Sequence, residues 1–149
     1  PEDDANRQIV NGFGLGMPGS PRRVQVAPPA GGWQKVIDCF GKEILSTLAQ
    51  YPERLVLLLI DCDGDEARLD EAIRSVPGEF ADRVLALGAR TEPERLRGDL
   101  GNCEAIGRAI AADCAGGSGE VWDHAMLRHI IPEVKRLRAA AGRLFGFQD

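Results

Sequence analysis

Three aspartates follow the most apolar stretch of the sequence, in the run Ile60-Asp61-Cys62-Asp63-Gly64-Asp65. Asp61 and Asp63 are two residues apart, so their side chains would point to the same side of an extended chain. Two carboxylates this close repel each other unless a proton or a cation lies between them. Hard oxygen ligands on a short acidic loop suit Mg²⁺ or Mn²⁺, which bind carboxylates together with water and phosphate oxygens. The pattern predicts a divalent-metal site centred on Asp61 and Asp63, with Asp65 either as a further ligand or as the cap of the next helix.

The segments around these aspartates predict a parallel sheet. The segment Arg54–Cys62 is almost continuously apolar, which is typical of a strand covered on both faces. Another strand is expected at Asp82–Gly88, and Arg23–Ala27 alternates apolar and polar residues as a strand does. Helical patterns separate the three strands, which should therefore be parallel with right-handed crossovers. Ligands of such sheets bind beyond the carboxyl ends of the strands, which is where Asp61 and Asp63 stand.

Helical periodicity accounts for most of the remaining chain. The clearest case is Trp33–Tyr51, whose apolar residues recur at steps of three and four and which Pro52 ends. Pro132 is expected to kink or split the last helix. We predict a three-layer α/β fold with a parallel sheet over residues 1–90 and a helical C-terminal extension over residues 91–149, packed on the same domain. The other predicted helices are Ala5–Val10, Asp65–Val76, Pro93–Leu100, Glu104–Cys114 and Trp122–Leu144, and a loop is predicted at Gly12–Arg23.

Charge and hydropathy narrow the classes of function. The net charge of −5 argues against a protein that binds nucleic acid unaided, yet the residues from His124 to Asp149 carry five basic and two acidic side chains. A phosphate-rich partner would meet this C-terminal helix most favourably, or be held by a partner protein, although such a charge run is also typical of a solvated helix face. The longest apolar run is too short to cross a membrane and the first residues are acidic, which favours a cytoplasmic protein without membrane insertion. An oligomer is compatible with these features.

The acidic residues also match the pattern of a known family. Glu2, the small-residue turn Ala30-Gly31-Gly32 before a helix, and Asp61-x-Asp63 after an apolar strand resemble the layout of the TOPRIM domain. That domain occurs in topoisomerases, bacterial primases and overcoming-lysogenization-defect nucleases. The resemblance covers the predicted α/β core and implies a TOPRIM-like (Rossmann-like) fold with Mg²⁺-dependent, nuclease-type activity on nucleic-acid phosphodiesters. It also implies that the two aspartates hold the metal, that Glu2 lies at the metal and assists proton transfer, and that Asp65 is an accessory ligand.

A second, more limited resemblance is to the receiver domain of response regulators. In that interpretation Asp3 and Asp4 would hold Mg²⁺ and Asp61 would accept a phosphoryl group. A receiver also needs a Ser or Thr after the next strand and a Lys after the last one, whereas Thr91 comes late and Lys135 lies in a predicted helix. A receiver-like signalling domain and a non-catalytic interaction domain are the alternatives to a metal-dependent phosphodiesterase.

Four further polar residues have simpler explanations. Glu92 and Glu94 follow the strand at Asp82–Gly88 and could reach a second metal, but acidic residues are also usual where a helix begins. His124 and His129 are five residues apart on the predicted last helix, so they diverge by roughly 140° and cannot easily share a metal. A capping role for the glutamates and a surface or core position for the histidines are favoured.

The tryptophans and cysteines are predicted to be structural. Trp33 and Trp122 each begin an amphipathic helix, which favours core anchors over platforms for base stacking. The cysteines are widely spaced and form no CxxC pair, so zinc and disulfides are not expected. We predict four reduced and mostly buried thiols at Cys39, Cys62, Cys103 and Cys114.

Overall fold

The computed structural model contains a parallel pair of strands among its described residues. In this pair, β1 (Val56–Leu59) lies beside β2 (Val84–Leu87), with Val56 opposite Val84 and Leu59 opposite Leu87. The chain between them includes α4 (Ala67–Arg74), as the crossover of a parallel pair requires. The protein is thus mixed α/β and mostly helical with a small parallel sheet, which confirms the predicted α/β class at this level. The structure describes residues 1–17, 23–91, 93–116 and 119–146.

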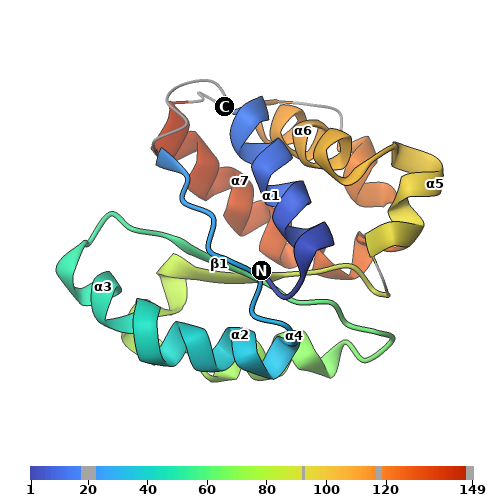
Figure 1. Cartoon of the computed structure of the whole chain (residues 1–149). Coiled ribbons are helices and arrows are strands. Elements are labelled where there is room, and N and C mark those ends of the chain that lie inside the picture. The colour runs from blue at the N-terminus through green and yellow to red at the C-terminus, as the bar shows by residue number, and fades with distance from the viewer. Residues whose placement is uncertain (18–22, 92, 117–118, 147–149) are drawn as a thin grey trace.

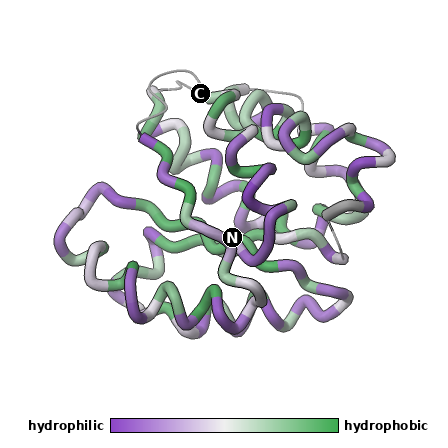
Figure 2. Tube along the Cα trace, viewed as in Figure 1, coloured by the Kyte–Doolittle hydropathy of each residue, from purple (hydrophilic) through white to green (hydrophobic). Residues whose placement is uncertain are grey.

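Helices lie on both sides of the strands (Figure 1). On one side are α2 (Trp33–Cys39), α3 (Leu45–Gln50) and α4; on the other are α1 (Asp4–Gly16), α6 (Cys103–Cys114) and α7 (Ile131–Phe145). The strands are hydrophobic, whereas the helices alternate between hydrophobic and hydrophilic residues (Figure 2). In the described part of the chain, no helix combines the length and the apolar character needed to cross a bilayer. The remaining helical segments are the π-helix Phe40–Ile44, α5 (Arg97–Leu100) and the 3₁₀ turns Gly78–Arg83, Pro93–Leu96, Glu120–Asp123 and Arg128–Ile130.

The long helix predicted at Trp33–Tyr51 is confirmed, since α2, the π-helical turn and α3 follow one another without a break. Val36, Phe40 and Leu48 from its apolar stripe are buried. The helix ends two residues before Pro52, whose ring cannot continue it. The cysteines are unpaired as predicted; Cys39 is half-buried and the other three are buried. Together with Leu48, the largest fully buried side chains among the described residues are Ile60, Val84, Leu96, Ile106, Cys62 and Cys103.

The predicted strand Arg23–Ala27 is wrong, because this stretch pairs with neither β1 nor β2 in the described structure. Val24 lies against α1 instead, so close that a Cβ on Gly14 would come within 3.6 Å of its side chain. The alternating pattern therefore marked a segment with one apolar side, and Val24 on that side packs on a helix. The loop predicted at Gly12–Arg23 is also wrong at its start, because α1 continues to Gly16 and packs along α6.

The end of the chain departs from the single helix predicted at Trp122–Leu144. The helix α7 begins at Ile131 and has Pro132 in its first turn, where a missing N–H costs no helical hydrogen bond. The residues before it form two short 3₁₀ turns. The helix predicted upstream of Pro132 is therefore wrong, and Pro132 lies at the start of α7 instead of kinking or splitting a longer helix.

Candidate functional site

The N-terminal residues lie beside the end of β1. The backbone N–H of Glu2 donates to the carbonyl of Leu59 at 3.0 Å, and the N–H of Gly31 donates to the carbonyl of Glu2 at 2.8 Å. The backbone N–H of Asp61 donates to Oε2 of Glu2 at 2.8 Å. The structure therefore brings together Glu2 and Asp61, two of the predicted site residues, although they are 59 positions apart in the sequence.

Asn6 joins this pair to the first turn of α1. Asp3 caps the helix by accepting the backbone N–H of Asn6 at 2.8 Å. The side-chain amide of Asn6 donates to Oδ1 of Asp3 and to Oδ2 of Asp61, both at 2.9 Å. Only 3% of Asn6 is exposed. Sequence reasoning missed this residue, and its one local signal is its place three residues after a capping aspartate.

Replacing Asn6 with Ala is expected to lower the free energy of unfolding by about 1–3 kcal/mol, because it leaves a buried carboxylate oxygen of Asp61 without its donor. Urea denaturation at pH 8 in the presence of a chelator measures the change. Gln8→Ala is the control, since Gln8 donates to Asp4 on the exposed surface of α1. It should change stability by less than about 0.5 kcal/mol. Equal effects of the two substitutions would show that the Asn6 bridge is unimportant.

Asp61 is a buried carboxylate that is only partly compensated. Its exposed fraction is 6%, and its Oδ1 has no hydrogen-bond partner among the described residues. Burial is the main cause that raises the pKa of Asp61 to about 7; the charge of Asp3 comes next, and those of Glu2 and Asp63 add to it. The hydrogen bond from Asn6 acts in the opposite direction. Burial also raises the pKa of Glu2. A cation bound here would relieve the repulsion among these groups.

Asp63 faces a different partner. Its backbone is left-handed, with φ 47°, and Gly64 follows with φ 83°, so the chain turns sharply after Cys62. Oδ2 of Asp63 accepts from Nη1 of Arg68 at 2.5 Å, and the same nitrogen donates to the carbonyl of Asp61 at 3.1 Å. The side chains of the two aspartates therefore have different partners, Asn6 for Asp61 and Arg68 for Asp63, because the turn interrupts the extended geometry on which that expectation rested.

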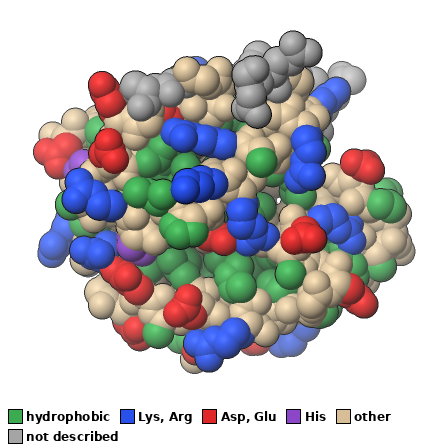
Figure 3. Space-filling view, turned by 180° about the vertical axis from the view of Figure 1, so that it is seen from behind, with side chains coloured by type: hydrophobic (Ala, Val, Ile, Leu, Met, Phe, Trp, Pro, Cys, Tyr) green, Lys and Arg blue, Asp and Glu red, His purple; other side chains and the backbone are tan. Residues whose placement is uncertain are grey.

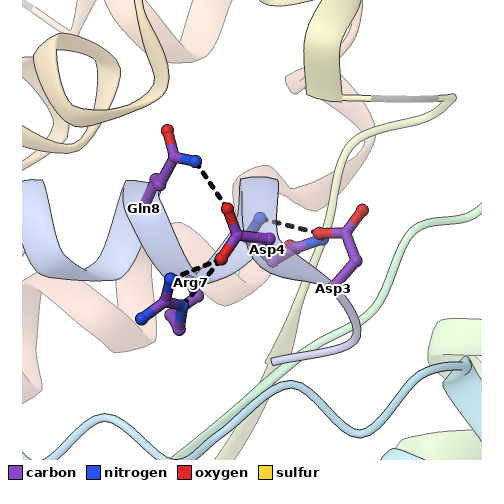
Figure 4. A network of polar contacts seen from close by, with 5 residues as sticks. Asp3, Asp4, Arg7 and Gln8 are labelled. Atoms are coloured by element: carbon purple, nitrogen blue, oxygen red, sulfur yellow. Dashed lines mark hydrogen bonds and ion pairs between the residues drawn. The ribbon is translucent and has the colours of Figure 1, made fainter.

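The remaining carboxylates near the site make local contacts. Oδ1 of Asp65 accepts the backbone N–H of Ala67, the first residue of α4, at 3.1 Å, although the N-cap position itself is Glu66. Asp4 points along α1, where it accepts from Arg7 and Gln8 (Figure 4). Asp65 and Asp4 thus stabilise the starts of two helices.

The prediction that His124 and His129 lie on one helix is wrong. Nε2 of His124 lies 3.0 Å from Oδ2 of Asp99, and Nε2 of His129 lies 3.5 Å from Sγ of Cys62. The two histidines therefore have separate partners in the structure. Glu92 and the side chain of Glu94 lie outside the described part of the chain.

The tryptophans occupy two different environments. Trp122 is buried, as predicted for a core anchor, and its Nε1 has no partner in the described structure. Trp33 is half-buried, and the guanidinium carbon of Arg68 lies over its ring, 5.7 Å from the centroid. Trp33 therefore belongs to the surroundings of the Asp61-x-Asp63 turn, which its position at the start of a helix did not indicate.

A divalent cation needs several oxygen ligands at one point. In the ranges that the structure describes, no group of three or more Asp, Glu, His or Cys side chains stands close enough to hold an ion. The donor chemistry fits Mg²⁺ or Mn²⁺ all the same, because Oδ1 of Asp61 is a buried carboxylate oxygen without a partner. Adding Asp63 to the ligand set requires its ion pair with Arg68 to open.

Comparison of the chain with models of known protein families, with curated proteins and with solved structures gives no significant match. The resemblance to the TOPRIM domain therefore stays a prediction from three short motifs. The structure adds the contacts among those motifs: Gly31 donates to Glu2, and Asp61 donates to Glu2.

Proposed function

We propose that this protein is a Mg²⁺- or Mn²⁺-dependent, TOPRIM-like domain that acts on nucleic-acid phosphodiesters. The observation that carries the proposal is the convergence of three distant motifs at the end of β1. Gly31 and Asp61 both contact Glu2, and Glu2 is itself bonded to Leu59 of the strand. Parallel sheets bind ligands at this end of their strands.

The proposed roles follow from the surroundings of each side chain. Asp61 and Asp63 would hold the cation together with Glu2, and Asp65 is the outer, accessory ligand. A bound divalent cation would polarise a phosphate and offset negative charge there. Oε2 of Glu2 is fixed by the N–H of Asp61, which leaves Oε1 as the oxygen that takes or gives a proton. Burial raises the pKa of Glu2 in the direction of neutral pH, and a general acid or base is most effective when its pKa lies near the operating pH.

Basic side chains offer a place for the nucleic-acid backbone. On the face opposite to that of Figure 1, Lys and Arg side chains are frequent in the half that holds α6 and α7 (Figure 3). Lys135 and Arg143 are exposed on α7, whereas Arg138 is bound to Asp113. With a net charge of −5, binding through α7 or through a partner protein is the route that we propose.

The receiver-like alternative has less support from the contacts. Asp4, one of its two metal-binding residues, is engaged by Arg7 and Gln8 on the surface of α1. Asp61, its phosphoryl acceptor, is 6% exposed with Oδ2 held by Asn6. A non-catalytic interaction domain is the remaining alternative, and the metal experiment below distinguishes it.

Millimolar Mg²⁺ or Mn²⁺ is expected to raise the melting temperature of the protein by about 5–10 °C, if the concentration is about a hundred times the dissociation constant. Asp61→Asn combined with Asp63→Asn should abolish the shift, because both proposed ligands lose their charge. Asp4→Asn, which removes a carboxylate bound to Arg7 and Gln8, should keep it. Differential scanning calorimetry with and without chelator measures the shifts, and cleavage of labelled DNA and RNA then tests the activity. No shift in the unmodified protein would leave the interaction domain as the better account.

A further inference from the structure

Arg68 lies across the turn that carries the proposed metal ligands. Nη1 of Arg68 donates to Oδ2 of Asp63 at 2.5 Å and to the carbonyl of Asp61 at 3.1 Å. The arginine side chain is 21% exposed and that of Asp63 is 47% exposed, so the pair lies at the surface, next to the buried Asp61. A guanidinium in this place supplies the positive charge that the carboxylates lack without a metal.

Trp33 also contacts this guanidinium. The centre of the guanidinium is 5.7 Å from the centroid of the indole ring, within the range of a cation–π contact. Trp33 follows Gly32 directly, and Gly31 is bonded to Glu2. The contact with Trp33 does not depend on Asp63, so the guanidinium would stay near the site if its bond to Asp63 opened.

A divalent cation and Arg68 compete for Asp63. Both are positive, and Arg68 occupies Oδ2 of Asp63 at 2.5 Å, so a cation that takes this oxygen has to displace the arginine, which it also repels. Binding of a cation through Oδ2 therefore requires the arginine to leave Asp63. A released guanidinium beside a metal finds its best partner in a phosphate, whose oxygens match the planar fork of donors.

We propose that Arg68 closes the acidic site in the metal-free protein and, once a divalent cation displaces it from Asp63, binds a phosphate of the nucleic-acid strand. The inference rests on the proposed function, and it adds a residue that both regulates cation binding and binds the substrate backbone. Its consequence is that removing the guanidinium has opposite effects on two ligands: the metal binds more tightly, and the strand binds more weakly.

The test compares Arg68→Gln with the unmodified protein. The dissociation constant for Mn²⁺, measured by titration calorimetry at low salt, should fall by about two- to fivefold, the range for an ion pair of this exposure. The affinity for a short fluorescent single-stranded oligonucleotide, measured by anisotropy with Ca²⁺ in the buffer, should fall by about tenfold. Arg90→Gln is the matched control, because Arg90 forms a 2.8 Å ion pair with Glu66. It should leave both constants unchanged.

The outcomes separate this inference from the proposed function. Mn²⁺ binding by the unmodified protein that Arg68→Gln leaves unchanged or weakens would overturn the role of Arg68 alone. Oligonucleotide binding that is insensitive to Arg68→Gln would do the same. Absence of Mn²⁺ binding in both proteins would overturn the proposed function and the inference with it. A thermal melt of metal-free Arg68→Gln confirms that the variant is folded.

Discussion

Asp61→Asn is expected to stabilise the metal-free protein at pH 8 by roughly 2–4 kcal/mol, since one pKa unit corresponds to about 1.4 kcal/mol. Folding raises the pKa of Asp61 from 3.8 to about 7, so the folded protein binds this proton more tightly than the unfolded chain does. The free energy of unfolding should therefore fall as the pH rises from about 4 to about 7 and stay low above that range. Asn carries no charge at any of these pH values, so the variant avoids this loss. Urea denaturation in chelator at several pH values measures both curves.

Asp4→Asn is the control for the pH profile. Asp4 is exposed, and hydrogen bonds from Gln8 and Arg7 lower its pKa. Its contribution has the opposite sign, because it is present above the unfolded pKa and is lost as the pH falls through the lowered one. Asp4→Asn should therefore gain no stability at pH 8. A stability curve for Asp61→Asn that runs parallel to that of the unmodified protein would contradict the assigned burial and repulsion.

The same repulsion links stability to the proposed cation. The charge on Asp61 at pH 8 lowers the free energy of unfolding, so a cation that offsets this charge should restore the lost stability. Asp61→Asn should remove both effects, the destabilising charge and its relief by a cation. The variant is then more stable than the unmodified protein without metal, and its stability does not respond to metal. This pairing of effects distinguishes a metal ligand from a buried carboxylate with a purely structural role, for which Asn would be stabilising but Mg²⁺ would have no effect on either protein.

Periodicity and apolar runs correctly predicted the helices and strands whose own residues carry the pattern. The helix from Trp33 and the strands β1 and β2 were predicted correctly because their own side chains carry the pattern. Arg23–Ala27 was predicted wrongly because alternation shows that one side is apolar without showing what covers it, and Val24 packs on α1.

The candidate site also combines residues that a local sequence pattern marks with residues that no local pattern marks. The residue type and spacing of Asp61 and Asp63 predicted them as site residues, and a family resemblance predicted Glu2. The roles of Asn6 and Arg68 depend on distances across the fold: Asn6 reaches Asp61 over 55 positions, and Arg68 reaches the turn from its place on α4. No local pattern marks such residues, since an Asn after a helix cap and an Arg on a short helix are ordinary.

Glycines at the end of α1 led to the wrong prediction of a loop there, although glycines also allow two helices to pack closely. Substituting a glycine at such a helix contact should have a large effect on stability. Gly107 of α6 lies so close to α1 that a Cβ there would stand 1.9 Å from the carbonyl oxygen of Ile9 and 2.6 Å from the nitrogen of Phe13. Both atoms are backbone, so neither can move aside without shifting the helix. Gly107→Ala is therefore expected to lower the free energy of unfolding by about 3 kcal/mol or more, at the upper end of overpacking effects. Urea denaturation at pH 7 measures the loss.

Gly98→Ala provides the matched comparison, because Gly98 lies in α5 and a Cβ there meets nothing within 4 Å. Alanine should be neutral or stabilise this helix by up to about 1 kcal/mol. If Gly107→Ala were as stable as Gly98→Ala, the close packing of α1 on α6 would be wrong. The change should also reach the candidate site, since α1 carries Asn6 and any shift of that helix lengthens the hydrogen bond from Asn6 to Asp61. Gly107→Ala should therefore weaken Mn²⁺ binding, whereas Gly98→Ala should not, which ties the helix packing to the geometry of the acidic residues.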